Sequence, residues 1–100
     1  MNYNKLTEAQ TERLAILMEE CGEVIQICGK ILRHGYESYN PYDNTKTPNR
    51  KLLEKEIGDI VWITEFMTTN NDINATNVIY AENQKDINIK QYLHHQEYKW

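Results

Sequence analysis

A short acidic motif occurs twice in this chain, each time inside an apolar helical pattern. Residues 16–27 read ILMEECGEVIQI, and residues 52–63 read LLEKEIGDIVWI. Each copy carries two carboxylates three residues apart, with an apolar residue four positions before the first and four after the second. Residues three and four apart share one face of an α-helix. The pattern therefore places four carboxylates where core side chains are expected: Glu20, Glu23, Glu56 and Asp59.

Carboxylates between two packed helices need a cation or a proton, because burying an uncompensated charge is costly. If the two helices pack antiparallel, the two motifs face each other and the four side chains converge. Oxygen-only ligands suit Mg²⁺ or Mn²⁺, whereas a di-iron bundle would need Glu-x-x-His, which neither motif contains. We therefore predict a Mg²⁺ (or Mn²⁺) site. The alternative is that these acids lie on the solvated faces of ordinary helices.

Each copy of the motif also contains a glycine at the same position, Gly22 and Gly58. A glycine inside a helix costs about 1 kcal/mol relative to alanine. We expect these two glycines to let the helices approach closely at the acidic site.

The first two helices are predicted from their caps and their apolar spacing. Thr7 begins a capping box with Gln10, and Gly35 is suited to end the helix that follows. Residues 34–47, HGYESYNPYDNTKT, are rich in turn formers and predict a long loop. Thr47 is the expected N-cap of the second helix, with Pro48 at its first position.

The second helix should end near Thr69, before the turn sequence Asn-Asn-Asp. A third helix is expected from Ala75 to about His95, with Asn74 as its cap and a possible break near Asp86. The fold class is therefore all-α. We expect long antiparallel helices that form a four-helix-bundle-like core.

Length and charge limit the partners of the chain. Its 100 residues form one domain, 1–100, whose core would be small, so we expect oligomerisation to complete it, as a homodimer or homotetramer. A net charge of -4 argues against a nucleic-acid partner. There is no apolar stretch for a membrane span and no secretion signal in MNYNKLTEAQ, so we expect a cytoplasmic protein.

Two cysteines, Cys21 and Cys28, lie seven residues apart in the first predicted helix. Their Cα atoms would be about 10 Å apart along the helix axis, too far for a disulfide. Free cysteines are usually buried, so we expect both to be small buried residues on the apolar stripe.

The paired motifs resemble a known signature. Glu20-Cys-Gly-Glu23 followed by Glu56-Ile-Gly-Asp59 is similar to the E-x-x-E…E-x-x-D pattern of the MazG-like superfamily of all-α nucleoside triphosphate pyrophosphohydrolases. Within this superfamily the chain resembles the small phage-encoded and bacterial MazG-like proteins more closely, because LMEECGEV is followed by Lys30-Ile-Leu-Arg33-His34-Gly35. The resemblance covers most of residues 14–67 and extends weakly to 96. The 32 residues between Glu23 and Glu56 exceed the spacing of compact MazG domains, and the extra length falls in the loop.

The resemblance implies hydrolysis of an NTP or dNTP between the α and β phosphates, giving NMP or dNMP and pyrophosphate. It also implies that the four acids are the metal ligands, and, for a phage-encoded protein, that the reaction occurs in the host cytoplasm. Glu19 breaks the symmetry of the repeat, because its counterpart is Lys55. Glu19 is a candidate to orient or deprotonate the attacking water, and a solvent-facing glutamate is the alternative.

Five further residues are candidates for substrate binding. Lys30, Arg33 and His34 could contact phosphate or base, or could simply complement the helix dipole. Trp62 could border the base, or could belong to a core or subunit interface. Lys85 could reach the distal phosphates.

Two other functions remain open at this stage. One is a non-catalytic helical interaction module that has kept a metal-binding scaffold. The other is a hydrolase that acts on a guanosine alarmone rather than on a standard nucleotide.

Overall fold

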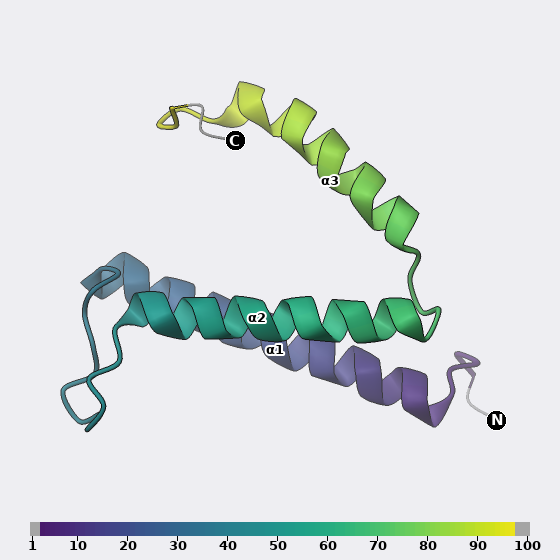
Figure 1. The fold of residues 1–100 in the computed structure, drawn as a ribbon, viewed down its shortest axis with the longest axis horizontal. Coiled ribbons are helices and arrows are strands. Elements are labelled where there is room, and N and C mark those ends of the chain that lie inside the picture. The colour runs from purple at the N-terminus through teal and green to yellow at the C-terminus, as the bar shows by residue number, and fades with distance from the viewer. Residues whose placement is uncertain (1–2, 98–100) are drawn as a thin grey trace.

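The computed structural model describes residues 3–97, which form helices and loops without any strand (Figure 1). The α-helices are α1 (Glu8–His34), α2 (Asn49–Thr69) and α3 (Ala75–Ile89), and a short 3₁₀ helix, η1 (Lys90–Tyr92), follows α3. The all-α prediction is confirmed for this part of the chain. None of these helices combines the length and apolarity that are needed to cross a bilayer.

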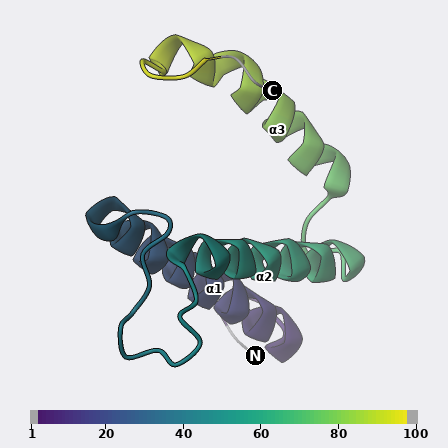
Figure 2. The same ribbon diagram turned by 60° about the vertical axis from the view of Figure 1, so that its left-hand side comes forward.

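The packed part of the molecule is the pair of helices α1 and α2, which lie side by side and run in opposite directions (Figures 1 and 2). Its apolar core is small and consists of Ile27, Ile63 and Met67. Ile27 follows Glu23 by one helical turn and Ile63 follows Asp59 by one turn. Since the helices are antiparallel, these two isoleucines lie on opposite sides of the acidic motifs along the pair.

Helix α3 leaves the end of α2 and extends away from the pair (Figures 1 and 2). It has no buried residue, and it exposes Val78, Ile79 and Tyr80. The chain is consequently extended, with a radius of gyration of 17.2 Å, whereas a compact domain of this length has about 13 Å.

The helix ends follow the local capping signals closely. Thr7 and Gln10 form the predicted capping box, and Gly35 ends α1 at φ 91°, a backbone conformation that suits glycine. Asn74 caps α3 by accepting a hydrogen bond from the backbone N–H of Asn77. Pro48, not Thr47, is the N-cap of α2, so this helix begins one residue later than predicted.

The predicted end of α3 near His95 is wrong. The α-helix continues through Asp86, where a break was expected, and stops at Ile89, after which η1 follows. Polar residues interrupt the apolar spacing throughout this segment. The sequence therefore has no continuous apolar stripe from which the end of the helix could be predicted.

Two other expectations are wrong because they assumed closer packing. Cys21 and Cys28 are both exposed, because they lie on the side of α1 that faces away from α2. A Cβ atom added at Gly22 or Gly58 would meet nothing within 4 Å. Close approach of α1 and α2 therefore does not explain either glycine.

A bidentate ion pair joins the beginning of α1 to the turn after α2. The Arg13 guanidinium donates to both carboxylate oxygens of Asp72, at 2.5 and 3.0 Å, and both side chains are about nine-tenths buried. Arg13 also lies over the ring of Phe66, 5.7 Å from its centroid. The pair lowers the pKa of Asp72 below its ordinary value, chiefly through the hydrogen bonds from Arg13.

The long loop between α1 and α2 is fixed to the start of α2. The backbone N–H groups of Asn49 and Arg50 donate to the carbonyls of Ser38 and Tyr36, both at 2.8 Å. The Asn49 amide, almost fully buried, donates to the carbonyl of Gly35 at 3.2 Å. The Arg50 guanidinium covers the ring of Tyr36 at 4.4 Å. The loop therefore holds a defined shape against the helix pair.

Candidate metal centre

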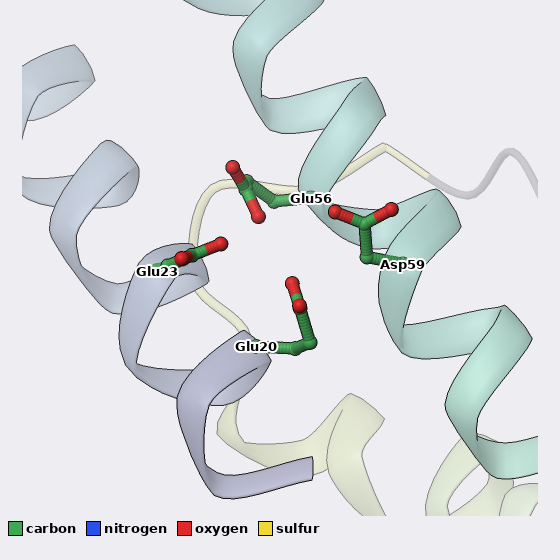
Figure 3. A group of neighbouring side chains, drawn as sticks. All are labelled: Glu20, Glu23, Glu56 and Asp59. Carbon is green, nitrogen blue, oxygen red and sulfur yellow. The ribbon is translucent and has the colours of Figure 1, made fainter. Parts of the chain in front are cut away.

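The four predicted carboxylates converge in the middle of the helix pair (Figure 3). Glu20 and Glu23 come from α1, Glu56 and Asp59 come from α2, and their side chains point toward one another. One oxygen of each lies within 4.8 Å of one oxygen of every other. The antiparallel packing of two helices with matched three-residue spacing produces this arrangement. All four side chains are half-buried.

Two oxygens in this cluster have no hydrogen-bond partner among residues 3–97. Oε2 of Glu20 and Oε2 of Glu56 are buried from solvent and accept no hydrogen bond. Buried polar atoms are almost always paired, so each such exception needs an explanation, and a bound ion or water is one. An acid-only donor set with two unsatisfied oxygens fits a hard divalent cation such as Mg²⁺ or Mn²⁺, which prefers oxygen ligands.

The crowding of like charges changes the acidity of the cluster. Burial raises the pKa of Glu20 to about 7, and repulsion from Glu23 and Asp59 adds to the effect. Hydrogen bonding to Glu23, together with burial, raises the pKa of Glu56. A raised pKa is the response expected of crowded acids that lack a cation.

Lys55 supplies a cation beside the cluster. Its Nζ lies 2.8 Å from Oδ2 of Asp59 and 3.6 Å from Oε1 of Glu56. The hydrogen bond to Asp59 raises the pKa of Lys55 to about 12, so the ammonium stays charged. Lys55 partly balances the α2 side of the site, whereas Glu20 on α1 has no such partner.

One pocket lies at the acidic cluster, and a second pocket lies next to it at the loop. The first, about 280 Å³, is lined by Glu23, Glu56 and Lys55 together with Lys30 and Leu52. The second, about 310 Å³, shares Lys30 and Leu52 with the first. The two pockets are therefore neighbours, and only the first includes acids of the cluster.

The second pocket, called the loop pocket below, is basic. Lys30, Arg33 and His34 from the end of α1 line it, as do Tyr39 and the buried Asn49. The three predicted substrate-binding residues of α1 therefore lie together at one pocket that adjoins the acids.

The other candidate residues lie apart from this arrangement. Trp62 is on α2 three residues beyond Asp59, half-exposed, and stacked on Phe66 with ring centroids 5.4 Å apart. Glu19 is exposed on α1 and is not among the four converging acids. Lys85 lies on α3, where it lines a pocket formed by residues of α3 and η1 only.

Sequence reasoning missed Lys55 and Asn49 as parts of the site. The Lys55–Asp59 spacing of four residues on a helix was a usable signal for an ion pair. Asn49 carried no comparable signal, because its burial depends on how the loop returns to α2.

Comparison with known proteins adds no relative. No protein-family model, no curated protein and no solved structure matches this chain.

Proposed function

We propose that this protein is a MazG-like, metal-dependent nucleoside triphosphate pyrophosphohydrolase that acts in the cytoplasm as a homo-oligomer. The observation that carries the proposal is the convergence of Glu20, Glu23, Glu56 and Asp59, with two buried oxygens that lack partners. The E-x-x-E…E-x-x-D resemblance gives this cluster its chemical interpretation.

The proposed reaction is attack of water on the α-phosphorus of an NTP or dNTP. The bond from that phosphorus to the α–β bridging oxygen breaks, so the products are a nucleoside monophosphate and pyrophosphate. When bound, Mg²⁺ or Mn²⁺ supplies positive charge to the phosphate oxygens and favours ionisation of water. Phosphoryl transfer depends mainly on positioning and on charge stabilisation, which a rigid pair of helices can provide.

The side chains of the chain have separate tasks in this proposal. The four acids hold the cation, and Lys55 fixes the orientation of Asp59 through its hydrogen bond. Lys30, at the junction of the two pockets, and Arg33 and His34, farther along, offer cationic contacts to the anionic substrate. Glu19 is the candidate that orients the attacking water.

Trp62 and Lys85 have less defined tasks. The exposed edge of Trp62 is suited to border a nucleobase, since aromatic rings stack on bases. Lys85 would act on phosphates only if α3 of the same or a second chain packs over the cluster.

The test is pyrophosphate release from a panel of NTPs and dNTPs, with Mg²⁺ or Mn²⁺ and with EDTA. We expect metal-dependent formation of a monophosphate and pyrophosphate. Glu56→Gln and Asp59→Asn should each lower kcat at least about a hundredfold, a loss of the size caused by removing one charge-stabilising group. Glu65→Gln, an exposed site on the same helix, is the matched control and should retain activity.

Other outcomes would contradict the proposal in different ways. Release of orthophosphate alone would indicate cleavage of another bond. Retention of activity in both acid variants would show that the ligand assignment is wrong. Turnover of a guanosine alarmone but of no standard nucleotide would favour the regulatory hydrolase, and absence of all turnover would favour a non-catalytic interaction module.

A further inference from the structure

Helix α1 is apolar on two opposite faces, and only one of them is covered by α2. The uncovered face follows a strict heptad pattern, with alternating steps of four and three residues over five turns. Its members are Leu14, Met18, Cys21, Ile25, Cys28 and Leu32. All six are exposed, and Met18, Ile25 and Leu32 have exposed fractions of 75%, 73% and 88%. A helix that is apolar all round is normally buried on all sides.

The total exposed surface of the chain is also too large for a compact monomer. Its accessible area is 8603 Å², about 2,600 Å² more than the roughly 6,000 Å² expected for a folded monomer of 11.9 kDa. Part of this excess belongs to α3. For two chains the excess is about 5,200 Å², which is at the upper end of the total area that obligate homodimers bury.

We propose that the uncovered face of α1 pairs with the same face of a second copy of this chain, antiparallel and about a two-fold axis near position 23. This inference does not depend on the proposed enzymatic function. A two-fold interface brings the same patch of both subunits together, so the patch must be complementary to itself.

The stripe meets this requirement in the antiparallel direction. With the axis near position 23, Leu14 faces Leu32 of the second copy, Met18 faces Cys28, and Cys21 faces Ile25. Each facing pair then joins one residue from each of the two heptad core positions. Every residue of the stripe has an apolar residue of the second copy opposite it.

The residues beside the stripe support the same register. Along one side of the stripe, small residues recur every seven positions, at Ala15, Gly22 and Gly29. A Cβ atom added at Gly22 or Gly29 meets nothing within 4 Å in the isolated chain. Antiparallel pairing would place Gly22 opposite Gly22 of the second copy, and Ala15 opposite Gly29, so that the two helices could approach closely. A close approach of two α1 helices would explain Gly22, which the packing of α1 against α2 does not explain.

One pair of opposite charges, next to the flank of small residues, is compatible with the antiparallel direction. Antiparallel pairing brings Glu12 near Arg33 of the second copy, which is an attractive contact. Glu20 and Glu23 lie about 200° around the helix from Met18 and Cys21, so the interface would leave the acidic cluster open.

Two measurements on the full chain test the association and its direction. We expect analytical ultracentrifugation at micromolar concentration to give a dimer, and Ile25→Glu to give a helical monomer, because residue 25 has no role in the packing of the isolated chain. For direction, Ile25→Cys in a Cys28→Ser background should form disulfide-linked dimers through Cys21 under mild oxidation. Cys28→Ser alone should not form such dimers, because Cys21 of one chain would lie about one helical turn away from Cys21 of the second chain.

The glycines provide a matched pair of variants. Gly22→Ala should weaken the dimer by about tenfold or more, because the added methyl groups meet across the axis. Gly58→Ala, equally open but on α2, should leave dimerisation unchanged and raise thermal stability through its higher helix propensity.

Several results would overturn the proposal. A monomeric wild-type chain would mean that α3 or another protein covers the stripe. Disulfide-linked dimers of Cys28→Ser alone would indicate parallel pairing. A dimer that survives both Ile25→Glu and Gly22→Ala would place the interface elsewhere.

Discussion

At the scale of single residues, Glu20 connects the chemistry of the site to pH. Its carboxyl has a pKa of about 7 in the metal-free protein, because it is buried among other acids. A proton and a cation compete for this group, so binding a cation must release the proton when the pH is below 7.

We therefore predict that Mn²⁺ affinity rises as the pH increases from 6 to 8. Isothermal titration calorimetry in buffers of different ionisation enthalpy would measure both the affinity and the protons released. Glu20→Gln should weaken binding and reduce the proton release, because the group that titrates in this range is gone. Affinity that does not change over this range would contradict the assignment of Glu20 as a ligand.

The convergence of the four acids could be predicted because the same three-residue spacing occurs on two helices that pack against each other. The cysteines could not be predicted from their apolar character, because Cys21 and Cys28 lie on the face of α1 that α2 does not reach. Whether a helix face is buried depends on which element packs against it, and the sequence of that helix alone does not identify the element.

At the scale of elements, the Arg13–Asp72 ion pair fastens one end of the helix pair. Asp72 has a lowered pKa, so the folded state holds this carboxylate ionised where the unfolded chain would begin to bind a proton. Its stabilising contribution is therefore fully present above the ordinary pKa of aspartate, near 3.9. It is lost as the pH falls through the lower pKa of the folded state.

We predict that Asp72→Asn lowers the melting temperature at pH 7, because it leaves the buried Arg13 charge without its counter-ion. The difference from wild type should begin to shrink below about pH 4, where the unfolded chain starts to bind a proton at Asp72, and disappear once the pH is below the lowered pKa of the folded state. Circular dichroism melts at a series of pH values would measure this. Glu37→Gln removes the exposed Arg50–Glu37 pair and should change the melting temperature little.

At the other end of the pair, Asn49 holds the loop that forms the loop pocket. We predict that Asn49→Ala raises KM for the nucleotide while Mn²⁺ affinity stays near wild type, because the amide bond to Gly35 shapes the pocket but does not touch the acids. Steady-state kinetics and calorimetry would separate the two effects. An equal loss of metal affinity would mean that Asn49 supports the whole pair of helices.

The helix starts and the end of α1 could be predicted because caps are local: Thr7, Gly35 and Asn74 each act within one helical turn. The end of α3 could not, since it depends on what that helix packs against. The return of the loop to Asn49 also depends on contacts between residues distant in the sequence.

At the scale of the whole molecule, the accessible area of 8603 Å² exceeds the roughly 6,000 Å² expected for a compact monomer of this mass. Its all-α class follows from the periodicity of the sequence, whereas the direction of α3 does not. An antiparallel dimer through α1 would place two acidic sites on opposite outer sides of a layer of four helices. The apolar residues of α3 would remain available to cover this layer.

The helix pair is fastened at both ends and repelled in its middle. Arg13 and Asp72 close one end, the anchored loop closes the other, and four crowded carboxyl groups lie between them. Repulsion within this cluster opposes the packing of the central turns. A bound cation would remove that repulsion, so the stability of the folded protein would depend on the concentration of the ion as well as on the sequence.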